Sequence, residues 1–307
     1  MVAVVFASCS KDATVAIACF NVPLVKTSLP LNIGTNSALI GGIAYDNGCA
    51  ILSRGVCWST SPNPTIDLET KTVNGSGSGE FKDELINLEE DQRYYLRAYA
   101  TNEAGTGYGS SLYFTTRKIT DPVHDSEGNV YQTIKIGDQI WMAENLKSTK
   151  YCNGDLIPNV TGNNWFSLTS DAWSYYNNQA ENNAMYGKLY NWYAATDKRN
   201  ICPCNWHLPT REEWMALMDY VGRNGGKLKS VTGWEGPNIG ATNETGFNGL
   251  PAGYRGPGNF VLYFGRDGGW WKNHLYSEAL NLTSYSDGMG NVALDKTTGA
   301  SVRCLKD

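Results

Sequence analysis

The stretch Ile201-Cys-Pro-Cys-Asn-Trp-His-Leu-Pro-Thr-Arg-Glu-Glu-Trp214 joins a Cys- and Pro-rich segment to the start of a short helix. Thr210 is a favourable N-cap residue, and Glu213 stands three positions later, where a capping-box carboxylate reaches back to the amide of the N-cap. Apolar side chains then recur at helical spacing. The stretch predicts a helix over residues 210–221 whose buried face carries Trp214, Leu217, Met218 and Val221.

The size and composition of the chain indicate two domains built mainly from strands and loops. With 307 residues, the chain is longer than one ordinary core supports. Gly, Asn, Tyr and Trp are abundant and charge is modest, which is typical of strand-and-loop domains rather than helical bundles. The formal net charge is -5 and Lys and Arg form no cluster, so no nucleic-acid partner is expected.

The first residues resemble the end of a bacterial lipoprotein signal. Residues 2–8 form a short apolar run of small side chains, and Cys9-Ser-Lys-Asp follows directly. The resemblance implies that Cys9 is lipidated and that this anchor is the only contact with the membrane. The alternative is a buried strand with an ordinary cysteine. Residues 1–27 are therefore predicted to be a signal remnant and a linker.

Residues 28–117 show the alternation of short strands. The pattern has a period of two in residues 37–44, 53–59, 93–102 and 111–116, and turn-rich stretches such as residues 74–79 separate the runs. In the third run, Tyr94, Leu96, Ala98 and Ala100 form the side expected to face the core.

The same region resembles fibronectin type III-like sandwiches of Bacteroidetes surface proteins. The resemblance rests on Leu88, on Tyr94-Tyr-Leu-Arg-Ala-Tyr and on Asn102-Glu-Ala-Gly-Thr-Gly-Tyr108-Gly. It implies a rigid spacer, and a ligand-binding role is the alternative.

Residues 118–307 carry an ordered series of motifs that resembles one known family, the Fibrobacter succinogenes major paralogous domain. This family is a bacterial extracellular module related to C-type-lectin-like folds. The motifs are Asp125-Ser-Glu-Gly-Asn-Val-Tyr131, Gln139-Ile-Trp-Met-Ala-Glu-Asn-Leu146, Tyr186-Gly-Lys-Leu-Tyr-Asn-Trp-Tyr-Ala-Ala195, the helix described above, Ala241-Thr-Asn-Glu-Thr-Gly-Phe247, Leu250-Pro-Ala-Gly-Tyr-Arg255, Trp270-Trp271 and Gly299-Ala-Ser-Val-Arg-Cys-Leu-Lys-Asp307.

The expected fold class is mainly β with an α+β head. An N-terminal fibronectin III-like β-sandwich precedes a C-terminal C-type-lectin-like domain. Within the latter, residues 118–124 are predicted to be a short linker, and a second helix is expected around residues 185–195. The remaining strands are joined by long Asn- and Gly-rich loops, which are uncommon in compact domains unless they are functional.

The chain has eight cysteines, and the sequence suggests partners for only some of them. The family resemblance places cysteines at Cys202 and Cys304, and a bridge between them would join the helix start to the last strand. Cys152 and Cys204 are a plausible second pair, although sequence alone leaves connectivity open. Cys57 is expected to be a buried hydrophobe that does not reach Cys49. A metal at Cys202-Pro-Cys204 is not expected, because neighbouring His and Cys ligands are lacking.

Catalysis is not expected from this chain. The three histidines, His124, His207 and His274, stand in a linker, beside the helix start and in a loop, and indicate no Ser-His-Asp or Cys-His set. Glu212 and Glu213 are better explained by the helix dipole. The alternative is an enzyme of the formylglycine-generating type, because those proteins share a similar Leu-Pro-Thr-Arg-Glu-Glu-Trp motif, although no second catalytic cysteine accompanies Cys304.

No cofactor or metal is predicted, with calcium as the alternative. The Glu-Pro-Asn and Gln-Pro-Asp loops of calcium-dependent lectins do not occur. Hard oxygen ligands would have to come from carboxylates that lack a cage-like spacing, namely Asp267, Glu278, Asp287 and Asp295.

A binding surface is the function that the sequence favours most. Between residues 254 and 300, Tyr, Trp, Phe and Arg alternate with Gly, Asn and Ser, a mixture typical of surfaces that bind other molecules. Neighbours on a strand face opposite sides, so at most one of Trp270 and Trp271 is expected to be exposed, and core packing is the alternative for each. The predicted ligand-binding residues are Tyr263, Arg266, Trp271, His274, Tyr276, Asn281, Tyr285 and Asp287.

Residues 256–298 depart most from the family pattern, while the motifs on both sides keep it. Lectin-fold proteins diversified by retroelements carry such mixtures of Asn, Ser, Asp, Gly, Tyr, His, Leu and Val in their last segment. The hypothesis is a diversified binding segment, and an ordinary divergent loop is the alternative.

The sequence thus predicts a lipid-anchored protein of the outer membrane, facing outward at the cell surface. Its partner would be a glycan or protein on another cell or host surface. A structural component of the cell envelope or of a pilus tip is a further alternative.

Overall fold

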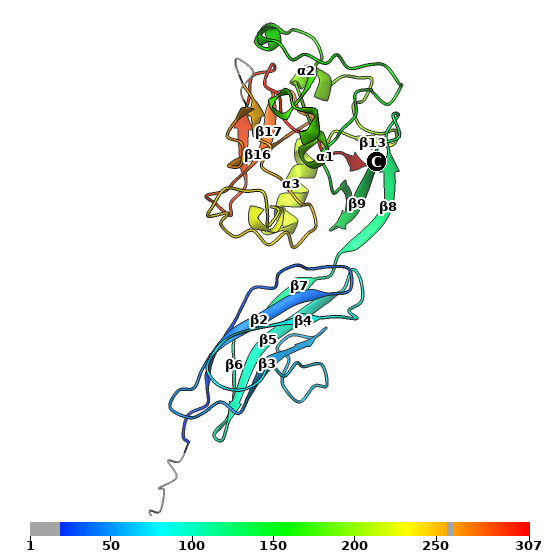
Figure 1. Cartoon of the computed structure of the whole chain (residues 1–307). Helices are drawn as coiled ribbons and strands as arrows, with labels where there is room; N and C mark the ends of the chain where they lie inside the picture. Colours follow the sequence, from blue (N-terminus) through cyan, green and yellow to red (C-terminus); the bar gives the residue numbers. More distant parts are fainter. Residues whose placement is uncertain (1–18, 257–260) are drawn as a thin grey trace, which may run out of the picture.

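The computed structural model describes residues 19–256 and 261–307. The chain is mainly β, and all of its paired strands run antiparallel. Figure 1 shows a β-sandwich, drawn in blue to cyan, and a second body, drawn in green to red. Below, these are called the sandwich (residues 24–115) and the head (residues 118–307). Cys9, the expected lipidation site, lies outside the described residues.

The sandwich consists of two sheets around one core. One sheet has the order β1-β2-β4, and the other has the order β3-β5-β6 with β7 also paired to β5. Tyr94, Leu96, Ala98 and Ala100 are buried in this core, as the alternation in β5 predicts. The strands are β1 (Leu24–Thr27), β2 (Ala38–Tyr45), β3 (Ser53–Ser59), β4 (Gly79–Leu85), β5 (Arg93–Asn102), β6 (Gly105–Tyr108) and β7 (Leu112–Thr115).

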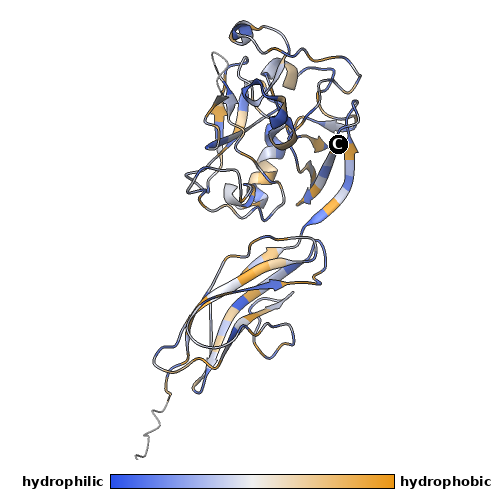
Figure 2. Cartoon of the chain, viewed as in Figure 1, coloured by the Kyte–Doolittle hydropathy of each residue, from blue (hydrophilic) through white to orange (hydrophobic). Residues whose placement is uncertain are grey.

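The first strand corrects the predicted linker. Residues 24–27 form β1 instead of a linker, because their backbone pairs with the edge of β2. A disulfide between Cys19 and Cys49 ties the preceding residues to the same end of the sandwich. Cys57 is unbridged and fully buried, in agreement with its prediction as a hydrophobe. Figure 2 shows hydrophobic residues interspersed with hydrophilic ones along the strands of the sandwich.

A five-stranded sheet forms the base of the head, in the order β13-β19-β10-β9-β8. Its strands are β8 (Lys118–His124), β9 (Val130–Ile136), β10 (Gln139–Met142), β13 (Trp206–His207) and β19 (Leu305–Lys306). The smaller sheets contain β11 (Trp173–Tyr175), β12 (Lys188–Tyr190), β14 (Tyr254–Arg255), β15 (Val261–Leu262), β16 (Asp267–Trp271), β17 (Glu278–Thr283) and β18 (Gly290–Ala293).

Residues 118–124 are a strand rather than the predicted linker. As β8, they pair with β9 at the edge of the five-stranded sheet, and Figure 1 shows β8 leading from the sandwich into the head. Contacts across the junction restrain the two bodies. The Arg117 guanidinium donates to the carbonyl of Asn243, and Lys135 Nζ lies 2.9 Å from Asp91 Oδ2.

The helices of the head are short, and one of them forms as predicted. In α3 (Arg211–Tyr220), the Thr210 hydroxyl accepts from the amide of Glu213, while the Glu213 carboxylate accepts from the amide of Thr210. Trp214 packs on Trp141 of β10 with ring centroids 4.6 Å apart, and the rest of the apolar face is also buried. No helix in the described ranges is long and apolar enough to cross a membrane.

The second predicted helix, over residues 185–195, is wrong. That segment contains α1 (Asn183–Tyr186), then β12, then α2 (Trp192–Ala195). Gly187 adopts a positive φ of 69° and ends α1. The chain then extends because Lys188, Leu189 and Tyr190 pair with β11.

Two disulfides brace the head. One joins Cys202 and Cys304, and thus the segment before β13 to the residue before β19, across a sequence separation of 102 residues. The other joins Cys152 and Cys204 across 52 residues. These are the two pairs named from the sequence. Each bridge lowers the conformational entropy of the unfolded chain. For loops of this length, that effect stabilises the folded state by about 4 kcal/mol per bridge.

His207 links the C-terminal residue to α3. Its Nδ1 lies 2.6 Å from Asp307 Oδ1, and its Nε2 lies 2.9 Å from Glu213 Oε1. Burial by itself lowers the pKa of His207, but the hydrogen bonds to Asp307 and Glu213 outweigh that effect and raise the pKa above its ordinary value. A raised pKa means that the folded state favours the imidazolium.

We therefore expect His207→Gln to cost roughly 1 kcal/mol in free energy of unfolding at pH 5.5, as partly exposed ion pairs do. The loss should shrink as pH rises from about 6.5, the unfolded value, through the higher pKa of the folded state. Urea unfolding between pH 5.5 and 9 measures both quantities. His124→Gln is the control, because His124 is exposed on β8. A difference for His207→Gln that grows with pH would contradict the assignment.

Candidate functional site

The candidate site lies on and around the sheet β16-β17-β18, within residues 256–298, where the sequence places the binding segment. In β16, successive side chains point into different parts of the interior. Trp270 packs with Leu280 and Leu282, while Trp271 packs with Ala279 in another cluster. Strand β16 is therefore covered on both faces. Asn281 of β17 and Val292 of β18 line a cavity instead.

Trp271 is not a binding residue, which corrects the prediction. Both Trp270 and Trp271 are fully buried, and the Trp271 indole donates to the carbonyl of Tyr190 at 2.7 Å. The two side chains face opposite sides as expected for strand neighbours. Neither is exposed, because residue 301 pairs with the outer edge of β16 and extends the covered surface.

Three of the predicted residues form one exposed group, which we call the Tyr-Arg cluster: Tyr263, Arg266 and Tyr285. The Arg266 guanidinium lies 4.9 Å from the ring centroid of Tyr285 and 6.0 Å from that of Tyr263. Tyr263 is 54% exposed and Tyr285 46%. Tyr263 precedes β16 and Tyr285 follows β17, so both rings lie at the open end of this hairpin, where they share the cation.

A cavity of about 240 Å³ opens beside the Tyr-Arg cluster. Of the predicted binding residues, Tyr263 and Asn281 line this cavity. Arg266, Tyr285 and Asp287 were also predicted but do not line it. Two carboxylates and several apolar side chains complete the wall. The other lining residues are Phe166, Tyr254, Gly256, Leu262, Asp267, Val292, Leu294, Asp295 and Thr298.

The polar groups of this cavity are held by one another. The Tyr254 hydroxyl donates to Asn281 Oδ1 at 3.1 Å. Burial raises the pKa of Asp267, against the opposing effects of Arg266 and of a hydrogen bond from Asn281. Burial, and then Asp267, raise the pKa of Tyr254, so that its hydroxyl keeps its proton. The cavity thus presents a fixed amide and a carboxylate between apolar walls.

Gly269 makes room for the Tyr254 ring. A Cβ at this position would lie 2.2 Å from Tyr254 Cε1, which is closer than real contacts allow. Gly269 therefore lets the ring lie directly against the backbone of β16. The sequence gives no direct sign of this role, since isolated glycines in a strand have several explanations.

His274 and Tyr276 form a separate pair at the other end of the hairpin. Their ring centroids are 5.5 Å apart, and Tyr276 is 70% exposed. Since the five residues of β16 separate this turn from the Tyr-Arg cluster, a small ligand does not reach both groups. The predicted residues therefore do not form one site. Tyr263, Arg266, Asn281 and Tyr285 lie at the cavity and the Tyr-Arg cluster, whereas the His274–Tyr276 pair, the exposed Asp287 and the buried Trp271 lie elsewhere.

The carboxylates considered for calcium do not come together as a cage. Asp267 and Asp295 line the cavity, whereas Glu278 and Asp287 do not. No group of three or more His, Cys, Asp or Glu side chains that could hold a metal ion occurs within residues 19–256 and 261–307.

Sequence reasoning missed Tyr254, Phe166 and Leu262 as parts of the site. Tyr254 belongs to the aromatic-rich segment but is absent from the predicted ligand-binding residues. It is 5% exposed, and its hydroxyl reaches Asn281. Phe166 belongs to a 3₁₀ helix, Asn163–Ser167, almost a hundred residues before the binding segment. No local pattern connects these positions.

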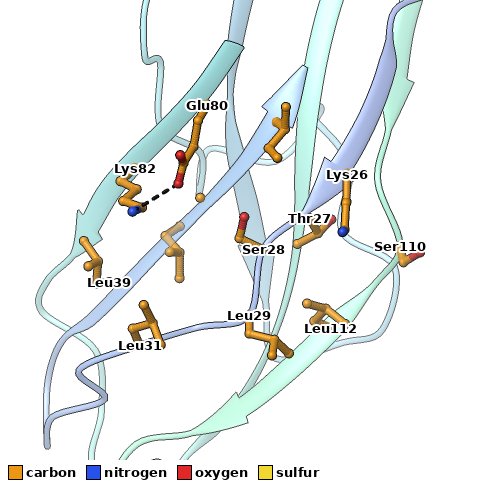
Figure 3. Close-up of a pocket in the computed structure, with 13 residues that line it drawn as sticks. Lys26, Thr27, Ser28, Leu29, Leu31, Leu39, Glu80, Lys82, Ser110 and Leu112 are labelled. Carbon is orange, nitrogen blue, oxygen red and sulfur yellow. Dashed lines mark ion pairs between the residues drawn. The ribbon is translucent and has the colours of Figure 1, made fainter. Parts of the chain in front are cut away.

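A larger groove of about 600 Å³ lies on the sandwich, beside β1, β2 and β4. Figure 3 shows Leu29, Leu31, Leu39 and Leu112 around it, together with the ion pair between Lys82 and Glu80. The groove is mainly apolar and no buried charged side chain lines it. It offers less chemistry for recognising a specific ligand than the head does.

The fold and the site define a mainly β, disulfide-bonded protein whose exposed aromatic residues gather at a small cavity. The chain belongs to the Fibrobacter succinogenes major domain family, whose model matches residues 134–306, more than half of the sequence. No curated protein is similar enough to count as a relative.

Solved structures resemble parts of the chain only weakly. The sensor domain of the anti-sigma factor RsgI4 from Pseudobacteroides cellulosolvens is 14% identical over 31% of this chain and 95% of its own, with a TM-score of 0.24. A solution structure of the same sensor domain is 17% identical over 30% of this chain and 73% of its own, with a TM-score of 0.22. A myokine structure is 15% identical over 32% of this chain and 98% of its own, with a TM-score of 0.23. These values do not support a common fold for the whole chain.

Lys229 holds the loop that carries Tyr285. Its buried ammonium donates to the carbonyls of Ile239, Thr283 and Ser286 at 2.7, 3.0 and 3.0 Å. Burial lowers the pKa of Lys229 to about 8, with Asp287 opposing the shift, so the group still carries its proton at neutral pH. All three of its hydrogens then have acceptors.

Replacing Lys229 with Met should lower the free energy of unfolding by about 3 kcal/mol, because three carbonyls lose a charged donor at once. The exposed Lys198→Met serves as the control, and it should change stability by less than about 0.5 kcal/mol. Urea unfolding at pH 7 measures both. Equal stability of Lys229→Met and the wild type would show that the three carbonyls are satisfied without the ammonium.

Proposed function

We infer that the protein is a surface binding protein whose head recognises a glycan or protein through the Tyr-Arg cluster and the adjacent 240 Å³ cavity. The observation that carries this inference is the gathering of Tyr263, Arg266 and Tyr285 beside the amide of Asn281 and the carboxylate of Asp267. Exposed aromatic rings and Arg supply large contact areas, and fixed polar groups supply orientation.

The proposal is that this protein works by binding rather than by covalent chemistry. Cys304, which a formylglycine-generating enzyme would need as a thiol, forms a disulfide with Cys202. Burial raises the pKa of the unbridged Cys57 to about 11, so this thiol is not a nucleophile at neutral pH. Both facts favour a binding role.

In this proposal, the sandwich is a fibronectin type III-like spacer and the head has a C-type-lectin-like fold. The lipid at Cys9 would anchor the protein in the outer membrane with the head facing outward. These assignments agree with the sandwich, which has one three-stranded and one four-stranded sheet, and with the long loops of the head. Family membership supports a surface-type protein.

We further propose that residues 256–298 vary among copies of the gene. Many loop asparagines of the head adopt a positive φ, for example Asn177, Asn200 and Asn243, and thus have a backbone role. Asn273, Asn281 and Asn291 of the binding segment do not, so another residue type at these positions would not strain the backbone. Deep sequencing of the coding DNA across the source population tests this proposal. A single invariant sequence would contradict it.

The binding proposal is tested with the full chain on glycan and protein arrays. Tyr263→Ala and Tyr285→Ala should each weaken binding to the best ligand at least tenfold, because exposed aromatic anchors dominate such surfaces. Tyr45→Ala is the matched control, since Tyr45 lies on the sandwich and is also 54% exposed. Tyr276→Ala examines the opposite end of the hairpin.

Unchanged affinity in Tyr263→Ala and Tyr285→Ala would overturn the assignment of the site. Loss in Tyr45→Ala alone would move the binding function to the sandwich. Absence of any array ligand, together with co-purification in an envelope assembly, would favour the structural alternative.

A further inference from the structure

A second cavity of the head, of about 480 Å³, is distinct from the one beside Tyr254. It has no lining residue in common with the first cavity. Its wall comes from the segment after β10, from α1 and from the loops around residues 230 and 250. The lining combines hydrogen-bonding side chains with apolar ones, namely Asn145, Ser230 and Asn248 with Met185 and Leu250.

One buried cation also lines this cavity. Arg303 is fully buried, and its guanidinium stacks on the ring of Phe247 with 4.2 Å between Cζ and the ring centroid. One terminal nitrogen donates to the carbonyl of Phe247, and the other donates to Asn145 Oδ1 at 2.6 Å. The Nε–H has no partner among the described residues. One N–H of a buried charged side chain that lines the cavity therefore has no acceptor.

The charge of Arg303 is not balanced by a carboxylate in contact with it. Glu144 lines the same cavity, but its carboxylate is paired with Lys147 Nζ at 2.5 Å. No ion pair within 4 Å is formed by Arg303 in the described part of the chain. Glu144, Lys147 and Arg303 together leave one net positive charge. Burial lowers the pKa of Arg303 to about 9, so the guanidinium is still charged at neutral pH.

A buried, unbalanced cation favours an anion in the adjacent space, because Coulomb attraction is strong where water is scarce. The neutral side chains of Ser230 and Asn248 offer both donors and acceptors, which suits a ligand that carries hydroxyl groups. Leu250 and Met185 offer an apolar surface of the kind that the face of a pyranose ring presents.

We propose that this cavity binds an acidic monosaccharide of the hexuronate class, with its carboxylate directed toward Arg303 and its hydroxyls hydrogen-bonded by Ser230 and Asn248. The cavity is large enough to admit a sugar residue, either free or at the end of an acidic chain. This site is independent of the Tyr-Arg cluster, and neither assignment requires the other.

The test uses isothermal titration of the full chain with D-galacturonate and with D-galactose, its neutral analogue. Galacturonate should bind at least tenfold more tightly, and added salt should weaken its binding. A trigalacturonide tells a free sugar from the end of a chain. If it binds as tightly as galacturonate, the cavity accepts the terminal residue of a chain; if it does not bind, the cavity accepts only the free sugar. Equal binding of galacturonate and galactose would overturn the proposal.

Two variants avoid changing Arg303 itself, which the fold needs. Met185 is 59% exposed and lines the cavity, so Met185→Trp should obstruct it and abolish galacturonate binding. Met215 is 44% exposed on α3, and Met215→Trp is the matched control that should bind normally. Glu144→Gln removes the negative charge of the cavity and should tighten binding several-fold.

Unchanged galacturonate affinity in Glu144→Gln, or normal binding by Met185→Trp, would overturn the proposal. Tyr263→Ala should leave galacturonate binding intact. Failure of this proposal is thereby distinguishable from failure of the surface-binding function.

Discussion

The head depends on one buried side-chain amide, that of Asn145. Its Oδ1 accepts from the Trp270 indole at 2.8 Å and from the Arg303 guanidinium at 2.6 Å. Its Nδ2 donates to the carbonyl of Tyr186 at 2.9 Å. The amide therefore ties the segment after β10 to α1, to β16 and to the last residues of the chain. A buried polar network of this kind specifies one arrangement, because any other arrangement leaves a charged or polar group without a partner.

Two buried cations in other parts of the head act on the same principle. The Arg303 guanidinium lies against the rings of Phe247 and Trp270. The Lys229 ammonium donates hydrogen bonds to three backbone carbonyls. The head has few regular helices, so its loops gain their order from such side chains and from asparagines with positive φ. A ligand that meets Tyr263 and Tyr285 consequently meets a surface whose loops are already fixed, which limits the entropy lost on binding.

Local features could be predicted well from the sequence. The capping box of Thr210 and Glu213, the buried face of α3 and the buried side of β5 form as expected, because each depends on neighbours within one or two turns or on strict alternation. The candidate site could be predicted only as a segment. Tyr263 and Asn281 reach the cavity, while Trp271 does not, and Phe166 and Tyr254 join it from elsewhere.

The sequence by itself determined the family, the mainly β class and the positions of the elements that have a local period. The tertiary structure alone decided that residues 118–124 pair as a strand, that residues 188–190 interrupt a helix, and that Trp270 and Trp271 are both buried. Each of these outcomes depends on a partner distant in sequence, such as residue 301 beside β16 or the backbone of β11 beside β12. The period of a segment reports which of its faces are apolar, but it does not report what covers those faces.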